Sequence, residues 1–311
     1  MKKVLKITGI VVLLLLIVAV VLVKYLGKAP SAPKDYQQTV KTGGALEEKY
    51  MASGPYEVSH CEESAWQGFG KYILYYPNPM TSGSHTYPVI VLSNGTGVPM
   101  SRYTAVAQHF ASWGFLVIGT EEEYDWNGFA AEMCIRYLQM LNTMESVNEQ
   151  ENAFYQKIDL EHVGIVGHSQ GGVGVINAIT VQQHSDVFKA AVSLSPTNQE
   201  MAQALQWDYD AAMVQTPIML ISGEGGGDDW VVTGEQLEAI YSDIGSSKAM
   251  LRRKDTPHGE TLYSANGYVT AWFLYWLQGD EEAGRAFTGD APEIMNNALY
   301  QDQKIHLDNE P

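Results

Sequence analysis

The stretch VGIVGHSQGGVG, residues 163–174, decides the fold. Its first half is typical of a buried strand and its second half of a helix, and the five residues between them read G-x-S-x-G. A turn this tight forces strained dihedral angles on Ser169, and the flanking glycines leave room for the neighbouring backbone. The hydroxyl then stands at the end of the strand, where the free N–H groups of the helix also point. The motif predicts that Ser169 is a nucleophile; the alternative is a glycine-rich turn without chemistry.

Short apolar segments alternate with longer amphipathic ones along the rest of the chain. We expect strands at residues 71–77, 87–93, 115–120, 162–168, 189–195, 217–223 and 248–253, and helices at 101–114, 127–144, 171–183 and around 268–276. Strands that are apolar on both faces and alternate with helices indicate a parallel sheet that is covered on both sides. The sequence therefore predicts an α/β fold with a mostly parallel central sheet, in one domain from residue 46 to 311.

The base that would activate Ser169 should follow it in the chain, because this turn goes with the order serine, acid, histidine. His258 lies in KDTPHGETLY, a loop directly after the last expected strand, where the rim of an active site belongs. His184 lies in an expected helix and His306 in a polar tail, so both are weaker candidates. His168 adjoins the serine, but successive residues of a tight turn project in different directions. We expect it to pack beneath the turn or to line the substrate pocket.

The acid is expected in EGGGDDWVV, residues 224–232, directly after a strand. Only one of the adjacent Asp228 and Asp229 can accept the imidazole N–H. We favour Asp229, because the apolar residues that follow it would re-enter the core and fix its direction. Asp228 is the alternative and Glu224 a weaker one. If neither aspartate is a catalytic acid, the stretch is a solvated acidic loop or a calcium site with few ligands.

An oxyanion formed at Ser169 needs two backbone N–H donors. One should belong to Gln170, directly after the nucleophile. The other should come from the glycine-rich loop SNGTGVP, where Thr96 is the first candidate and Gly97 the next. We also expect Gly95 and Gly97 to contact the substrate, together with His168.

These residues resemble the α/β-hydrolase family in the segments GHSQGG, GGGDDWVV, TPHGE and SNGTG. The resemblance covers roughly residues 55–280 and is greatest to cutinase-like polyester hydrolases, chlorophyllases and relatives of dienelactone hydrolase. It implies an α/β-hydrolase fold that cleaves carboxylic esters through an acyl-enzyme, without a metal or an organic cofactor. Dienelactone hydrolases use cysteine where this chain has Ser169, which disfavours that activity. Polyester hydrolases often carry an aromatic residue where this chain reads LSPTN, and they often carry a C-terminal disulfide, whereas no cysteine follows Cys134 here. Both departures disfavour a polymer substrate.

Lids of this family are often inserted between the strands expected at 189–195 and 217–223, and the segment between them is short here. We therefore expect a minimal lid and an open cleft lined by Trp207. Two other functions compete with an esterase. A serine peptidase or amidase on the same fold is disfavoured by the missing large lid. A catalytically inactive, membrane-tethered binding module is disfavoured by the apparently intact triad.

Charge and hydropathy limit the partners. The net charge of −17 excludes nucleic acid, and a monomer that acts on a small-molecule or lipid-like ester is expected. Lysines at positions 2, 3 and 6 precede an unbroken apolar run at 7–23, long enough to span a bilayer. We expect residues 1–26 to be a transmembrane anchor or signal segment and 27–45 a flexible tether, with the catalytic domain outside the cytoplasm. Cleavage near residue 31 would instead release a secreted enzyme.

Overall fold

The computed structural model of the protein describes residues 29–64, 70–80, 84–147 and 149–308. Over these ranges, no helix combines the length and the apolar character that a membrane span requires. The segment predicted to be an anchor, residues 1–26, lies outside the described residues.

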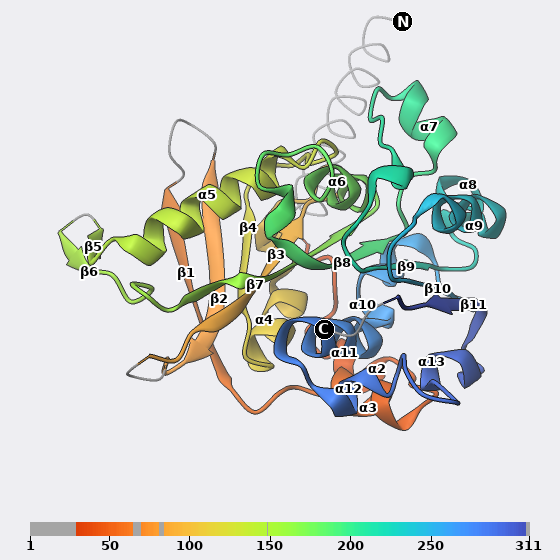
Figure 1. Cartoon of the computed structure of the whole chain (residues 1–311), viewed down its shortest axis with the longest axis horizontal. Helices are drawn as coiled ribbons and strands as arrows, with labels where there is room; N and C mark the ends of the chain where they lie inside the picture. Colours follow the sequence, from red (N-terminus) through yellow and green to blue (C-terminus); the bar gives the residue numbers. More distant parts are fainter. Residues whose placement is uncertain (1–28, 65–69, 81–83, 148, 309–311) are drawn as a thin grey trace, which may run out of the picture.

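A nine-stranded sheet runs through the described part of the chain in the order β1-β2-β4-β3-β7-β8-β9-β10-β11 (Figure 1). The strands are β1 (Glu57–Ser64), β2 (Lys71–Asn78), β3 (Tyr87–Ser93), β4 (Leu116–Thr120), β7 (Ile158–His168), β8 (Phe188–Leu194), β9 (Ile218–Ser222), β10 (Lys248–Arg253) and β11 (Tyr300–His306). The inner strands from β4 to β10 pair in parallel, whereas β1, β2 and β11 pair antiparallel at the two edges. The predicted, mostly parallel sheet is confirmed. A separate ribbon pairs β5 (Ser146–Val147) with β6 (Gln150–Glu151).

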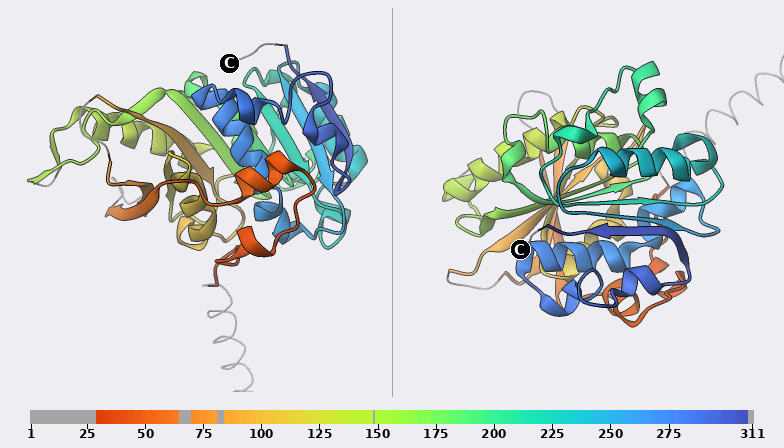
Figure 2. Two further views of the ribbon diagram at one scale, coloured as in Figure 1. Left: turned by 90° about the horizontal axis from the view of Figure 1, so that it is seen from below. Right: turned by 45° about the vertical axis from the view of Figure 1, so that its right-hand side comes forward.

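Helices cover both faces of the sheet, as predicted (Figures 1 and 2). They are α2 (Tyr36–Thr39), α3 (Ala45–Met51), α4 (Thr104–Ser112), α5 (Phe129–Thr143), α6 (Gln170–Ala178), α7 (Gln199–Ala204), α8 (Asp228–Val231), α9 (Gly234–Asp243), α10 (Thr261–Ser264), α11 (Asn266–Gln278), α12 (Glu281–Gly284) and α13 (Glu293–Asn296). One face carries α5, α6 and α9. The other carries α4 and α11, with α3 packed on α11.

The register of the inner strands brings their carboxyl ends level. Ser93 at the end of β3 lies beside Gly167 of β7, and His168 lies beside Leu194 of β8. Leu194 in turn lies beside Ile221 of β9. The loops that leave these strands therefore meet at one edge of the sheet, where a site can be assembled from all of them.

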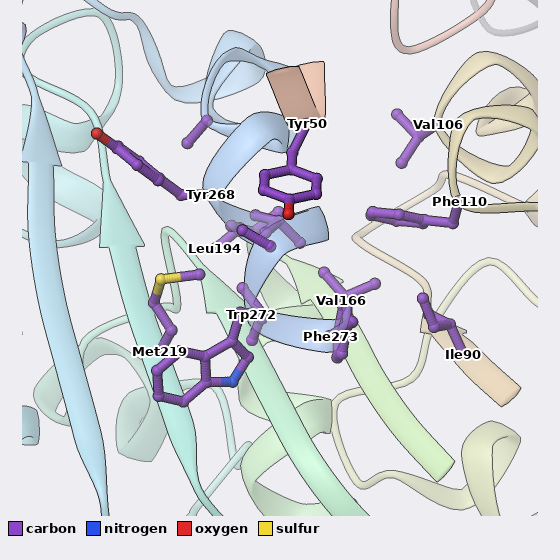
Figure 3. Packing of buried hydrophobic residues seen from close by; sticks show 14 of the residues in the cluster. Tyr50, Ile90, Val106, Phe110, Val166, Leu194, Met219, Tyr268, Trp272 and Phe273 are labelled. Carbon is purple, nitrogen blue, oxygen red and sulfur yellow. The ribbon is translucent and has the colours of Figure 1, made fainter. Parts of the chain in front are cut away.

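The apolar helix α11 fills most of one face of the core. Figure 3 shows Trp272 and Phe273 pointing from it toward the strands. The Phe273 ring meets Phe110 of α4 edge-on, with centroids 5.9 Å apart. Gly164 of β7 leaves the space for that ring, because a Cβ there would lie 2.6 Å from it. Burying each of these aromatic side chains stabilises the fold by about 2–3 kcal/mol.

Residues 29–45, predicted to be a flexible tether, pack against the domain instead. Ala32 and Tyr36 are buried. The Nε atom of Arg102 donates to the Ala29 carbonyl at 2.7 Å, and the Asn266 amide donates to the Tyr36 hydroxyl at 2.6 Å. The tether prediction is wrong over these residues, because their few apolar side chains, spaced by prolines and lysines, were not recognised as part of the core. The domain boundary at residue 46 moves toward the N-terminus accordingly.

A buried polar network joins this N-terminal segment to the end of the chain. Glu47 of α3 accepts hydrogen bonds from Arg253 at 3.0 Å, from Asn297 at 2.7 Å and from the Tyr300 hydroxyl. A carboxylate without such partners would be costly to bury. Because Arg253 is the last residue of β10, the network braces the strand just before the loop of His258.

The two cysteines, Cys61 and Cys134, are free thiols. Cys134 of α5 is buried, and burial raises its pKa well above the usual value. Burial also raises the pKa of Cys61 in β1 to about 11. Both thiols therefore stay protonated and poorly nucleophilic near neutral pH.

Candidate active site

The turn between β7 and α6 has the geometry predicted for a nucleophile. Ser169 has φ 60° and ψ −121°, a strained conformation for a residue other than glycine. Its N–H donates to the Leu194 carbonyl at the end of β8, at 2.8 Å. A Cβ on Gly171 would lie 2.2 Å from the Ser93 carbonyl oxygen, and one on Gly167 would lie 2.2 Å from the carbonyl oxygen of Gly171. Both glycines are therefore required by the close packing of the turn.

His258 lies on the same edge, in the loop after β10, where a 3₁₀ turn begins (His258–Glu260). Its N–H donates to the Gly226 carbonyl at 3.0 Å, which ties the histidine loop to the loop after β9. Its Nδ1 lies 2.6 Å from Oδ1 of Asp228. An ionised carboxylate only accepts hydrogen bonds, so Nδ1 carries the proton and Nε2 of the neutral ring is left as the basic atom.

The carboxylate that meets His258 belongs to Asp228, not to the favoured Asp229. Asp228 begins α8 and is 1% exposed, whereas Asp229 is exposed. Asp229 would be held in place only if the residues that follow it turned into the core at once. Trp230 is instead 63% exposed, and the chain re-enters the core only at Val231. The structure thus corrects the choice to the alternative residue.

Backbone and hydroxyl donors hold the second oxygen of Asp228. Its Oδ2 accepts from the Gly223 N–H at 2.6 Å and from the Ser195 hydroxyl at 2.7 Å. Burial acts to raise the pKa of Asp228, but the hydrogen bonds from His258, Ser195 and Gly223 outweigh it and hold this pKa below the usual value. The carboxylate is therefore ionised at neutral pH, although it is buried.

His168 packs beside this pair, and its expected place in the substrate pocket stays a prediction. Its Nε2–H donates to the carbonyl oxygen of His258 at 2.8 Å, and the two rings lie 4.6 Å apart. Burial, together with the neighbouring imidazole of His258, lowers the pKa of His168 to about 4. The ring is neutral at pH 7 and its Nε2 is occupied, so it supports the histidine loop.

The loop after β3 presents one free amide beside the serine. The Gly95 N–H donates to the Tyr103 hydroxyl at 2.9 Å, and the Gly97 N–H donates to the Glu123 carbonyl at 2.8 Å. Between them Thr96 is exposed, and its N–H has no acceptor within the described residues. As the first residue of α6, Gln170 has an N–H that no carbonyl of its own helix can accept.

The open cleft that the sequence predicts around the site stays a prediction. Trp207 follows α7 and is half-buried, so its contact with a substrate stays a prediction. A hollow of about 690 Å³ lies elsewhere, among residues such as His162, Phe188 and Pro217 at the amino ends of β7, β8 and β9. Among the described residues, no three or more His, Cys, Asp or Glu side chains are grouped to hold a metal ion.

Ser195 is a member of the site that the sequence reasoning missed. It directly follows β8 and bonds the Asp228 carboxylate. One signal was available: the residue ends a strand that was expected at 189–195, so it had to lie on the same edge as Ser169. Nothing in the local sequence indicated which carboxylate it would meet.

Comparisons with known proteins place the chain among ester hydrolases. The family model described as PETase, PET hydrolase-like, matches residues 34–301. Bis(hydroxyethyl) terephthalate hydrolase of Streptomyces coelicolor is 27% identical over 233 residues, which are 72% of this chain and 67% of that protein. Cutinase 2 of Thermobifida cellulosilytica is 29% identical over 147 residues, which are 46% of this chain and 52% of that protein. Cutinase est2 of Thermobifida alba is 30% identical over 147 residues, and the chain spans about half the length of these cutinases.

Proposed function

The chain belongs to the PET hydrolase-like family, and from that premise we propose that it cleaves esters through an acyl-enzyme on Ser169. At the level of the family the chain is a carboxylic ester hydrolase. One observation carries the proposal: a strained serine at the head of α6 shares the sheet edge with a half-buried His258 that is hydrogen-bonded to the buried Asp228. Elsewhere this combination activates a serine hydroxyl.

The proposed reaction uses the three side chains in order. Ser169 Oγ attacks the ester carbonyl while His258 Nε2 takes its proton, and the imidazolium then protonates the leaving alcohol. A water molecule, deprotonated by the same nitrogen, releases the acid from the serine. Asp228 holds the proton on Nδ1 throughout and stabilises the imidazolium, which its low pKa supports because the carboxylate stays ionised.

The amides of Thr96 and Gln170 are the proposed oxyanion donors. The N–H groups of Gly95 and Gly97 are bound elsewhere, which supports Thr96 as the donor from this loop. A donor in this role typically lowers the barrier by about 3 kcal/mol. Gly95 packs closely on the nucleophile turn, because a Cβ there would lie 3.0 Å from the His168 carbonyl oxygen and 3.9 Å from the Cβ of Ser169, and this proximity to Ser169 supports its proposed contact with substrate.

The proposed substrates are small esters that reach Ser169 from the open side. The Streptomyces relative, named for bis(hydroxyethyl) terephthalate, supports a diester of an aromatic acid as the first compound to assay. The short segment after β8, with α7 and Trp207, supports access without a large lid. We propose that Trp207 contacts the acyl or alcohol group, which a Trp207→Ala variant tests through KM.

The apolar run at residues 7–23 is the basis for a second proposal, that the enzyme is held on the outer face of a membrane. The full chain should sediment with membranes and a chain that starts at residue 29 should not. Recovery of the full chain free in the medium, with a new N-terminus near residue 31, would support secretion instead.

Ser169→Ala tests the proposed function directly. We expect at least a thousandfold loss of hydrolysis of p-nitrophenyl esters, with unchanged circular dichroism, because losses of a triad serine are of this size or larger. A fluorophosphonate probe should label the wild type and not the variant. Ser242→Ala, which removes an exposed hydroxyl on α9, is the matched control. A variant that keeps more than about a hundredth of the turnover would disprove the role of Ser169.

A further inference from the structure

Ser195 has an unusual backbone conformation for a buried serine. It follows β8 directly, is fully buried and has φ 43°. Its N–H donates to the Ile221 carbonyl at 2.6 Å, which holds the residue in this conformation. A positive φ costs a residue with a Cβ about 1 kcal/mol or more, and glycine would avoid that cost. A strained serine at this place therefore indicates that its hydroxyl is used.

The hydroxyl reaches the carboxylate that orients the candidate base. Ser195 Oγ donates to Asp228 Oδ2 at 2.7 Å, beside the Gly223 N–H at 2.6 Å. The Thr261 hydroxyl lies at 3.5 Å, the limit of a hydrogen bond. With Oδ2 occupied in this way, Oδ1 is left for the Nδ1–H of His258.

We propose that Ser195 is a positioning residue of the triad, whose hydroxyl sets both the orientation of the Asp228 carboxylate and the strength with which it accepts the His258 N–H. The inference rests on the proposed function, because it needs His258 to act as the base. It adds a fourth side chain, from a fourth strand end, to the three that the proposed reaction uses.

The direction of the effect follows from charge. A donor on Oδ2 draws negative charge away from Oδ1, so it weakens the stabilisation of a protonated imidazole at His258. Without the Ser195 hydroxyl, His258 stays protonated up to a higher pH, and a protonated imidazole cannot act as the base. His168 is the other titratable group that faces this pair. Exposed carboxylates on the same loops, such as Glu224, keep their charge in the variants.

Ser195→Ala and Ser195→Gly together test the proposal, since both remove the hydroxyl and only the second relieves the strain. We expect kcat to fall about tenfold in both, the loss typical of a hydrogen bond to a charged group. KM should stay within about twofold, and the midpoint of the acid limb of kcat/KM should rise by roughly half a pH unit. The glycine variant should be the more stable of the two, which guards against failure of the alanine variant to fold.

Ser193→Ala is the matched control, because Ser193 is a buried serine of the same strand that bonds a backbone carbonyl, that of Gly172. It should leave the midpoint of the acid limb unchanged. Equal midpoints in wild type and Ser195→Gly, with activity reduced only in proportion to the folded fraction, would overturn the inference. If Ser169→Ala were fully active, the proposed function itself would fail, so the two failures are distinguishable.

Discussion

The nucleophile turn and the acid loop lie on one edge of the sheet but are specified in different ways. The turn around Ser169 shows its constraints in its own sequence, because Gly167 packs against the Gly171 carbonyl and Gly171 against that of Ser93, and neither site has room for a side chain. The loop at 223–232 offers two adjacent carboxylates, and contacts from β8 and from the histidine loop select Asp228. The glycines of the turn can be recognised in five residues of sequence, whereas a choice between two adjacent carboxylates that other strands make cannot.

The largest effect should come from exchanging the two aspartates for asparagine in turn. Asp228→Asn should lower kcat by about a thousandfold or more, because an amide favours the wrong tautomer of His258. Asp229→Asn, which changes an exposed charge one residue away, should change kcat by less than about twofold. Steady-state kinetics on a p-nitrophenyl ester measures both. If Asp229→Asn caused the larger loss of kcat, the exposed Asp229 would be the catalytic acid and the assignment of Asp228 would be wrong.

A smaller effect is expected on stability. Replacing a glycine of the nucleophile turn should lower the free energy of unfolding more than replacing a glycine of the acid loop. Gly171→Ala places a Cβ against the Ser93 carbonyl and should lower the free energy of unfolding by about 2–3 kcal/mol or more. Gly225→Ala in the acid loop has φ 89° but open space around it, so it should cost only about 1 kcal/mol. Urea denaturation at constant pH gives both values. Equal losses of the free energy of unfolding would show that the nucleophile turn can relax as easily as the acid loop.

The remaining effect concerns the pH dependence of stability and the support beneath the nucleophile turn. Asp125 is buried, accepts from the Ser93 hydroxyl at 2.7 Å and from the Ala130 N–H at 2.8 Å, and donates its own N–H to the Gln170 side chain. Burial raises the pKa of Asp125 to about 7, above its value in an unfolded chain. Its contribution to stability is therefore complete below about pH 4 and is lost as the pH rises through 7.

Asp125→Asn should remove this part of the pH dependence and flatten the free energy of unfolding between about pH 4 and 7. The difference from the wild type should amount to a few kcal/mol at most across that range. Asp186→Asn, at an exposed aspartate, is the control and should leave the slope unchanged. An unchanged slope in the Asp125 variant would mean that the carboxylate is already ionised in the folded chain.

Much of the fold was predictable, because the central strands are apolar on both faces and cannot be anything but buried. The outermost strands were not, since β1 and β11 consist mostly of polar residues and resemble loops. His306 was placed in a polar tail and lies in β11, paired with Lys248. The packing of residues 29–45 was missed for a related reason, because single buried side chains such as Tyr36 give no periodic signal.

In the site, the sequence predicted those residues whose position depends on a strand end and its turn, which are Ser169, His258 and the loop of Thr96. It could not decide between Asp228 and Asp229, and it missed Ser195, because both depend on contacts between loops far apart in the chain. Their catalytic roles stay predictions until the variants are measured.

The network around Glu47 has a consequence for a chain that is still being made. Its partners Arg253 and Tyr300 lie 206 and 253 residues further along. While synthesis proceeds from the N-terminus, α3 has no cation for its carboxylate, and docking it early would bury an uncompensated charge. β10 likewise stays without this brace until β11 has emerged. The strand that carries the loop of His258 is thus braced only after residue 300 has been made, and until then this edge of the site has no support from the network.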